Sequence, residues 1–505
     1  MKINKKITTS VAGASLVLTL LGFLSKGIGF IREIIYANNF GLSSEFDLFL
    51  SSIALPNLIN TAIIFLSQHY FVPSYNRIKK VSESDGIVFF NYTFWWFIIG
   101  GLVLALLLYL FSGMIFHSYL GTISLEKQQL GIKIFVVFLI TIPLNAGMSI
   151  IMAFQQAKFK FVYPAISLIL LNVIVIILVV LFSDLLEILI LPISFVSGYF
   201  AAFAFLVVLV KENLKFLSQD LFKVKHKFSE FRILIALIII EGSSLSYVLI
   251  DRYFITNVSV GGISALNYAF VIFSLPISLF SIPLITTMFS RFSNSPQTLN
   301  VDYKNSLNMN FFIMIPFMFI LLFWGDHFLR FFYERGKFSA SDTLTTYSAL
   351  QYYSLSLIFL SSYFLIVKIL YSLNQYLFIL KISIVAFALK IFLNIWLVKD
   401  FQQNGLALST TITYMFLSLT GYFFGIKKMI SKEYYSPFLS GFYFILNASL
   451  SYSCVKVISS LFNIEHNPFS LLGLVLFSIL FLTNSYYTDD IEFNIIKRTL
   501  LGMFR

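Results

Sequence analysis

Long hydrophobic runs separated by short polar segments recur along the whole chain. A helix needs about 20 apolar residues to cross the hydrocarbon core of a bilayer, and fourteen runs approach that length. They lie near residues 9–31, 47–71, 87–111, 131–153, 161–183, 187–210, 232–250, 263–289, 308–330, 347–372, 375–398, 405–426, 438–461 and 469–487. The pattern therefore predicts an all-α polytopic membrane protein of about fourteen transmembrane helices.

Lysine and arginine are distributed unequally between the two sides of this topology. With the N-terminus in the cytoplasm, 22 of the 35 basic residues fall on the inner side, eight on the outer side and five within the runs. Because cytoplasmic loops carry the excess of positive charge, both termini are expected in the cytoplasm. The first run follows three lysines as in a signal peptide, but no good cleavage site follows it, so we interpret it as an uncleaved helix.

Two lobes are predicted from a repeat within the chain. A shift of 220 residues brings several matching residues together: Arg32 with Arg252, Gly41 with Gly261, Ser44 with Ser264, Leu55 with Leu275 and Pro56 with Pro276, while Asp47 falls on Asn267. The shift spans an even number of helices, so the two copies share one orientation in the membrane. Transporters rock such lobes against each other around a central site.

The longest loop, near 211–231, is basic and follows the sixth run, where a linker between six-helix lobes is expected. The predicted divisions are an N-lobe at 1–210, a cytoplasmic linker at 211–231, a C-lobe at 232–430, and two final helices with a cytoplasmic tail at 431–505.

Composition supports a lipid environment. Hydrophobic residues make up 58% of the chain, charged residues only 11%, and the mean hydropathy is +0.88. The net charge of +12 lies in short clusters between the runs rather than in one stripe, which favours anionic headgroups over nucleic acid as its partner. The single cysteine, Cys454, excludes an internal disulfide, and no cysteine and histidine cluster predicts a metal site.

Catalytic motifs of soluble enzymes are missing from the sequence. Gly336-Lys337 lacks the upstream glycine of a phosphate-binding loop. The paired carboxylates Asp489 and Asp490 follow the last run, where a solvated tail is expected. We therefore predict a transporter rather than an enzyme, without a cofactor other than a coupling cation or proton.

Charged residues within or at the ends of the runs are the candidate functional residues, because each costs about 2.5–3.5 kcal/mol at the centre of a membrane helix. They are Lys26, Arg32, Asp47, Glu241, Asp251, Arg252, Lys368, Lys381, Lys390 and Lys456. Basic side chains predominate, and a basic cavity suits a polyanion such as a diphosphate.

We assign Lys26, Arg32, Asp47, Asn57 and Arg252 to a substrate-binding cavity, and Glu241 to ion coupling or to a structural salt bridge. Arg32 and Arg252 are equally interpretable as interfacial anchors at helix ends. Lys381 and Lys390 lie nine residues apart, about 180° around a helix, so at least one of them is expected to snorkel or to contact another helix.

Several motifs resemble the MurJ/MviN family. They are Gly29-Phe30-Ile31-Arg32-Glu33, Ala37-Asn38-Asn39-Phe40-Gly41, Asp47-Leu48-Phe49, Leu55-Pro56-Asn57-Leu58, Phe71-Val72-Pro73, Asp251-Arg252, Gly262 to Ala269, Leu275-Pro276, Glu334 to Ser339 and Gly405-Leu406-Ala407-Leu408. The likeness extends over nearly the whole chain. It implies a lipid flippase of the bacterial inner membrane, whose best-known relatives carry lipid II, with the last two helices associated with a groove for the lipid tail.

The sequence departs from the family at several central positions. Lys26 stands where an arginine is usual, Ile59-Asn60 or Asn60-Thr61 replaces an arginine pair, and Phe270-Val271 replaces Asp-Arg. A polyprenyl-diphosphate-linked saccharide is therefore the expected cargo, either lipid II or a surface-polysaccharide repeat unit, moved by alternating access. Membrane lipids are the other expected partner, and a monomer is the expected state.

Two other functions are alternatives. A multidrug or cation antiporter of the same superfamily predicts an acidic and aromatic cavity, whereas basic residues outnumber Glu241 and Asp47 here. A membrane polysaccharide polymerase predicts a large outer loop with basic and histidine residues, and no outer loop exceeds roughly 20 residues. A scaffold without transport leaves the charges within the runs unexplained.

Overall fold

The computed structural model describes residues 11–120, 123–214, 231–254, 258–286, 299–427, 437–461 and 469–487. Within these ranges the regular structure is helical and no strand occurs. This confirms the predicted all-α class. The predicted linker at 211–231 and the tail after 487 lie largely outside the described residues.

The chain forms two compact units. Unit 1 comprises Met1–Ser264 with Tyr333–Ser339, and unit 2 comprises Ala265–Phe332 with Ala340–Arg505. This division follows packing, whereas the predicted lobes follow the repeat, so the lobe boundaries remain a prediction. In particular α12 (Phe231–Tyr253) packs against α3 and α4 within unit 1.

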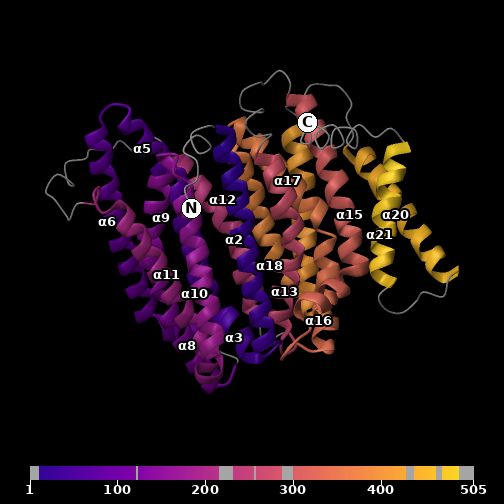
Figure 1. The fold of residues 1–505 in the computed structure, drawn as a ribbon, viewed down its shortest axis with the longest axis horizontal. Coiled ribbons are helices and arrows are strands. Elements are labelled where there is room, and N and C mark those ends of the chain that lie inside the picture. The colour runs from indigo at the N-terminus through magenta and orange to yellow at the C-terminus, as the bar shows by residue number, and fades with distance from the viewer. Residues whose placement is uncertain are drawn as a thin grey trace. The chain divides into compact units, whose positions relative to one another are not determined.

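Unit 1 is the indigo-to-magenta part of Figure 1. Its helices are α2 (Val11–Phe40), α3 (Ser44–Ser52), α4 (Ala54–Leu66), the π-helix Ser67–Phe71, α5 (Val72–Lys79), α6 (Glu83–Leu110), α7 (Ser112–Leu120), α8 (Leu125–Leu139), α9 (Thr141–Ala157), α10 (Val162–Leu186), the 3-10 turn Glu187–Leu189, α11 (Ile190–Val210) and α12. α10 packs against both α2 and α11, and α6 packs against α9.

Unit 2 begins within α13 (Gly262–Pro276) and is coloured orange to yellow in its later part (Figure 1). It continues with the π-helix Ile277–Ser281, α15 (Leu299–Tyr333), α16 (Ala340–Ser354), α17 (Leu357–Ser372), α18 (Tyr376–Thr420), the π-helix Gly421–Ile426, α20 (Pro437–Leu461) and α21 (Phe469–Tyr487). α18 is two helices joined at Gln402, whose φ of +48° and ψ of −129° break the helical conformation.

Among the described residues, eight helical segments are long and apolar enough to cross a membrane, or nine when a bent pair is counted as one span. They are Ser44–Lys79, Glu83–Leu110, Leu125–Ala157, Val162–Val210, Gly262–Thr286, Val301–Tyr333, Tyr376–Ile426 and Leu439–Ser460, and the bent pair is Ala340–Ser354 with Leu357–Ser372. The chain is thus polytopic, as expected, while the number fourteen remains a prediction. Val162–Val210 and Tyr376–Ile426 each contain a turn, at Glu187 and Gln402.

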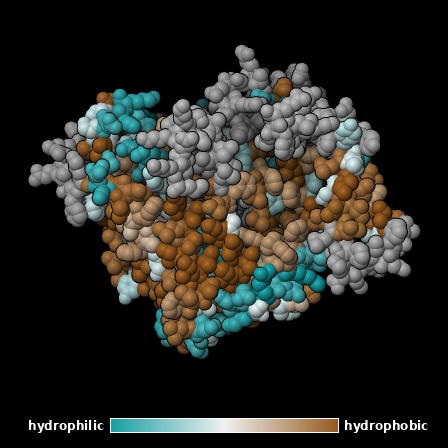
Figure 2. All heavy atoms as spheres, viewed as in Figure 1, coloured by the Kyte–Doolittle hydropathy of each residue, from teal (hydrophilic) through white to brown (hydrophobic). Residues whose placement is uncertain are grey.

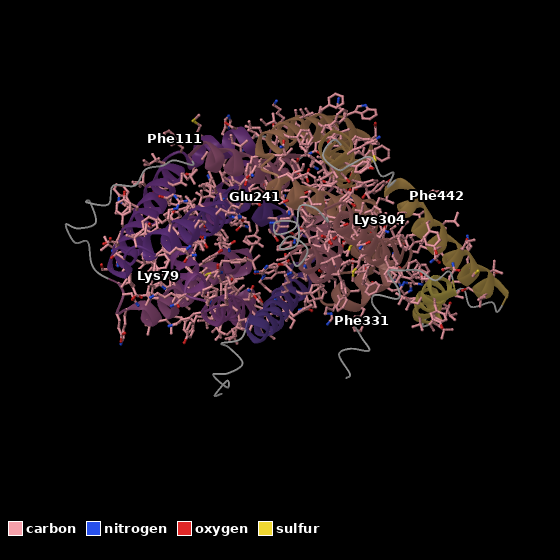
Figure 3. The ribbon with its side chains drawn as sticks, turned by 90° about the horizontal axis from the view of Figure 1, so that it is seen from above. Lys79, Phe111, Glu241, Lys304, Phe331 and Phe442 are labelled. Carbon is pink, nitrogen blue, oxygen red and sulfur yellow. The ribbon has the colours of Figure 1, made fainter. Side chains whose placement is uncertain are left out.

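Hydrophobic side chains cover the outside of the helices. On the face of unit 1 seen in Figure 2 they form a broad band with hydrophilic residues at its two margins. Leu106 and Leu110 of α6 and Val180 and Leu181 of α10 are more than half exposed, and Phe111 and Phe442 are two further exposed aromatic residues marked in Figure 3. Such a surface requires lipid as its solvent.

Polar side chains join helices in the interior of each unit. In unit 1, Asn60 donates to the hydroxyl of Thr141 at 2.9 Å, which connects α4 to α9. In unit 2, Asn310 accepts from Ser281 at 2.9 Å and donates to Ser361 at 2.8 Å. Hydrogen bonds of this kind between membrane helices are commonly worth about 0.6 kcal/mol each.

Candidate functional site: charges among the membrane helices

Arg32 lies on α2 and is held from several sides within unit 1. Its guanidinium donates to Asn172 of α10 at 2.9 Å and to Glu33 at 2.6 Å. It also lies 5.1 Å from the ring centroid of Phe195 and 5.6 Å from that of Tyr36. The side chain keeps 21% of its surface exposed. Arg32 is therefore a fixed, partly accessible cation, with N–H groups beyond the two used in these bonds.

Asp47 lies on α3 and is buried. Its carboxylate accepts hydrogen bonds from the backbone N–H of Gly261 at 2.7 Å and of Ser264 at 2.6 Å, and from the hydroxyl of Ser264 at 2.5 Å. These donors lie at the first turn of α13, where unpaired backbone N–H groups and the helix dipole favour an anion. The carboxylate of Asp47 therefore caps the N-terminus of α13, a helix that begins 215 residues later in the chain.

Arg252, at the end of α12, contacts the same turn. It is 7% exposed and donates to the carbonyl oxygen of Ile263 at 2.8 Å. Asp47 and Arg252 thus hold residues 261–264 from two sides, one through N–H groups and the other through a carbonyl. The structure brings these two predicted site residues together around a backbone turn.

Three glycines with positive φ pack closely in the same unit. Gly41, Gly261 and Gly336 have φ values of +52°, +81° and +57°. A Cβ added to any of them would lie under 3.0 Å from a backbone oxygen, of Lys337, Leu42 and Asn38 respectively. The N–H of Lys337 also donates to the carbonyl of Asn38 at 2.8 Å. Only glycine accepts both the conformation and the close approach, so residues 38–42 contact both 261 and 336–337.

The other predicted site residues lie elsewhere on unit 1. Lys26 on α2 and Asn57 on α4 are exposed, and Glu241 on α12 is partly buried (Figure 3). The contacts given above place Arg32 beside α10 and Arg252 beside the first turn of α13. The cavity assignment for these residues remains a prediction.

Lys381 and Lys390, both on α18, differ as their spacing predicts. Lys381 is exposed and Lys390 is completely buried. The Lys390 Nζ donates to the hydroxyl oxygens of Ser409 and Thr410, each at 2.7 Å, and to the carbonyl of Leu406 at 3.1 Å. Sequence reasoning found this lysine as an inter-helix candidate but not its acceptors, because Ser409 and Thr410 read as ordinary membrane-helix residues.

A basic cluster lies at one end of unit 1, at the C-terminal ends of α5 and α9. The Nζ of Lys158 lies 4.1 Å from the ring centroid of Phe154. Partial burial, together with the charges of Lys160 and Lys79, lowers the pKa of Lys158 from its ordinary value of 10.5. An anion bound beside Lys158, Lys160 and Lys79 would reduce the repulsion among their ammonium groups.

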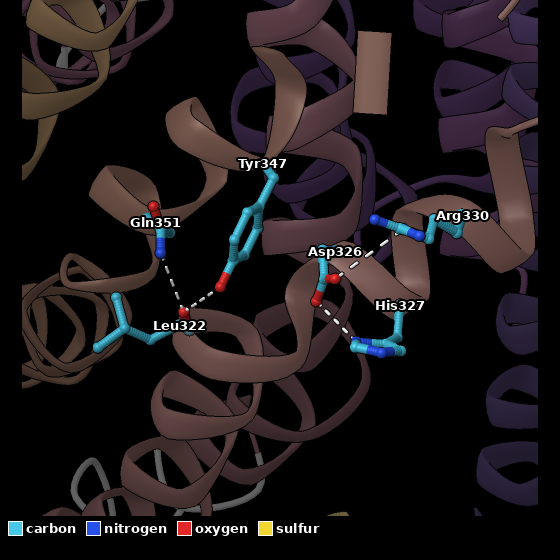
Figure 4. A network of polar contacts seen from close by, with 6 residues as sticks. All are labelled: Leu322, Asp326, His327, Arg330, Tyr347 and Gln351. Carbon is cyan, nitrogen blue, oxygen red and sulfur yellow. Dashed lines mark hydrogen bonds and ion pairs between the residues drawn. The ribbon is translucent and has the colours of Figure 1, made fainter. Parts of the chain in front are cut away.

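A second polar network lies near the C-terminal end of α15 in unit 2 (Figure 4). Asp326 contacts His327 at 2.7 Å and Arg330 at 3.9 Å. The hydroxyl of Tyr347 on α16 donates to the carbonyl of Leu322 at 2.7 Å. The Tyr347 hydrogen bond joins α16 to α15, whereas the contacts of Asp326 lie within α15 and are partly exposed. Among the described residues, no group of three or more histidine, cysteine, aspartate or glutamate residues is arranged to hold a metal ion.

A family model and a curated relative carry the same family name. A family model described as "Lipid II flippase MurJ" matches residues 36–477. A protein of Buchnera aphidicola subsp. Schizaphis graminum (strain Sg), named as a probable lipid II flippase MurJ, is 27% identical over 459 residues, which cover 84% of either chain.

Solved structures share the fold. A structure titled as lipid II flippase MurJ in an inward closed conformation is similar, with a TM-score of 0.78 and 23% identity, covering 94% of this chain and 99% of the other. An inward-facing multidrug resistance transporter of the MATE family and the MOP superfamily is similar at a TM-score of 0.62 and 12% identity, covering 81% and 94%.

Proposed function

The chain belongs to the MurJ family of lipid II flippases, and from that premise we propose that it carries a polyprenyl-diphosphate-linked saccharide from the inner to the outer leaflet of the bacterial inner membrane. The family resemblance found in the sequence is thereby confirmed, and a lipid flippase is a transporter rather than an enzyme. A cation antiporter and a polysaccharide polymerase, the two alternatives, are not favoured.

The geometry of Arg32 is the observation that carries the proposal. A diphosphate is best recognised by a guanidinium whose orientation is already fixed, because little conformational entropy is then lost on binding. Glu33 and Asn172 fix that orientation, the ring of Phe195 lies close to it, and a fifth of the side chain stays accessible. The exposed Lys26, six residues earlier on α2, adds positive charge on the same helix.

Alternating access is the proposed mechanism. In the topology expected from the basic residues, 38–47 form the outer end of the first hairpin. Their contacts with 261–264 and 336–337 would keep the outer side closed while a headgroup enters from the cytoplasm. Release then requires Asp47 and Gly41 to part from those residues. Both termini are proposed to be cytoplasmic, and we propose a monomer with either a cation or a proton as the coupling ion, with Glu241 as its candidate site.

Lipid II is the first cargo to test. The relatives named as lipid II flippases support it, whereas the departures at 59–61 and 270–271 leave a surface-polysaccharide repeat unit as the second candidate.

Complementation provides the test. A bacterium depleted of its own lipid II flippase would be supplied with this chain, with Arg32→Gln, or with Lys381→Ala as a control at an exposed position of α18. We expect growth with the unmodified chain and the control and none with Arg32→Gln. Lysis despite normal amounts of the unmodified chain in the membrane would contradict lipid II as the cargo. A matched assay for export of a surface polysaccharide then tests the other saccharide.

A further inference from the structure

Lys390 is a completely buried lysine whose amino group is surrounded by oxygen atoms of unit 2. It lies on the first helix of α18, before the turn at Gln402, and its three acceptors, Leu406, Ser409 and Thr410, lie on the second helix. Burying an ammonium is costly unless hydrogen bonds replace its hydration. The oxygens of this site therefore replace the water molecules that hydrate an ammonium group in solution.

Each hydroxyl of the site has another oxygen within hydrogen-bond distance. The Ser409 hydroxyl donates to Asn394 and also lies 2.8 Å from the carbonyl of Leu406. The Thr410 hydroxyl lies 3.0 Å from the same carbonyl. Each hydroxyl thus has an acceptor for its own hydrogen and turns a lone pair toward Nζ. Three oxygen acceptors thus lie within 3.1 Å of Nζ, an arrangement that suits the N–H donors of a protonated amine.

The two helices of α18 pack closely beside Lys390. A Cβ added to Gly405 would lie under 3.0 Å from the carbonyl oxygen of Leu397. The two helices of α18 therefore approach each other closely beside the turn, and Lys390 and Asn394 reach across, one helical turn apart. Protein oxygen atoms also replace the hydration shell of K⁺ in channel filters, and the carbonyl and two hydroxyls of this site are oxygen ligands of the same kind.

We propose that the ammonium of Lys390 is a resident cation in an oxygen-lined site of α18, and that shortening this side chain converts the site into one that binds a small monovalent cation. The unmodified protein then needs no dissolved cation at this place to hold the two helices together. The inference does not rest on the proposed cargo, and its test measures stability rather than transport.

The test compares thermal unfolding of the purified full chain in KCl, in NH₄Cl and in N-methylglucamine chloride at equal ionic strength. N-methylglucamine is too large for the site. We expect the unmodified protein to unfold at the same temperature in all three salts. Lys390→Ala is expected to unfold about 5 °C or more lower in N-methylglucamine and to regain part of that loss in KCl or NH₄Cl.

Two controls separate the cation from the volume of the side chain. Lys390→Met fills the space without a charge, so it is expected to stay destabilised in every salt. Lys381→Ala, on the exposed side of α18, is expected to behave as the unmodified protein. A Lys390→Ala variant that ignores K⁺ and NH₄⁺ overturns the proposal, and so does an unmodified protein that gains as much from these ions as the variant does.

A further pair of variants keeps the proposal testable if Lys390→Ala does not fold. Thr410→Val and Ser409→Ala each remove one acceptor and leave the ammonium in place. Both are expected to unfold at lower temperature without a dependence on the salt. Unchanged unfolding temperatures in both variants would mean that these oxygens do not hold the ammonium, and the proposal would be wrong.

Discussion

Asp47 accepts hydrogen bonds from both the backbone N–H and the hydroxyl of Ser264, at 2.6 and 2.5 Å, although 217 residues separate the two. A shift of the sequence by 220 residues brings Ser264 onto Ser44, which begins α3, the helix that carries Asp47. The structure thus shows that Asp47 caps the start of α13, while its assignment to a cavity remains a prediction.

Replacing Asp47 by asparagine tests the cap. The substitution removes the charge and turns an amide N–H₂ toward a set of donors, so we expect a loss of about 1–2 kcal/mol in the free energy of unfolding. Chemical denaturation of the purified protein measures it. Glu45→Gln, at an exposed position of the same helix turn, is the matched control and is expected to change little. Equal stability of the two variants would contradict the cap.

Alanine at Gly336 or Gly41 tests the close approach of the loops. Each substitution places a Cβ under 3.0 Å from a backbone oxygen and forces an L-residue into the left-handed region. We expect losses of about 1–3 kcal/mol in unfolding free energy. Gly113→Ala, in α7, where the added Cβ meets no atom within 4 Å, serves as the control and should not destabilise the protein. Gly336→Ala and Gly41→Ala variants as stable as the unmodified protein would contradict the close contact between residues 38–42 and 336–337.

Two substitutions of Arg32 test whether its positive charge or the planar shape of its guanidinium matters for translocation. Arg32→Lys keeps the charge but loses the planar fork that binds Asn172 and Glu33 together. We expect translocation of a labelled lipid-linked saccharide in vesicles to fall about tenfold or more in Arg32→Gln and by less in Arg32→Lys. Unfolding temperatures measured in parallel separate a binding defect from misfolding. Undiminished translocation by a well-folded Arg32→Gln protein would refute the role assigned to this arginine.

The basic cluster predicts a pH dependence of stability. Because the pKa of Lys158 is lowered in the folded protein, the unfolded chain binds more protons than the folded protein in the range between the folded pKa and 10.5. This lysine therefore opposes folding by a constant amount below its folded pKa and by less as the pH rises from that pKa toward 10.5. Lys158→Met is therefore expected to unfold at higher temperature than the unmodified protein at neutral pH, with a difference that shrinks toward pH 10.5. Lys127→Met, at an exposed position, should show no such trend. A difference that does not change with pH would contradict the lowered pKa of Lys158, which burial causes first and the charges of Lys160 and Lys79 second.

Hydrophobic runs of about 20 residues were sufficient to predict the polytopic helical class, because a membrane leaves few other ways to satisfy the backbone. They also separated the helices on either side of two turns, since the runs end at 183 and 398 and resume at 187 and 405, close to Glu187 and Gln402. They did not show the positive φ of these two residues, because neither is a glycine or an asparagine. The spacing of Lys381 and Lys390 did predict opposite surroundings, because the helical period alone fixes the angle between them.

Partners distant in the sequence were beyond prediction. Nothing in the composition around Asn172, Ser264 or Thr410 distinguishes these residues from other polar residues of membrane helices, and each gains its role from a charged group on another helix. The spacing of polar residues along a helix predicts which of them face away from lipid. It does not predict which residues of another helix they contact.

The sequence by itself determined the helical membrane class, the repeat, the family and the positions of the charges, since these depend on local hydrophobicity and on residue identity. Only the tertiary structure decided what each charge contacts: Asp47 a helix start, Arg252 a turn, Arg32 a carboxylate and an amide, and Lys390 a set of oxygens. The physical reason is that a charge within a membrane must find its compensation in three dimensions, and the groups that provide it lie on other helices.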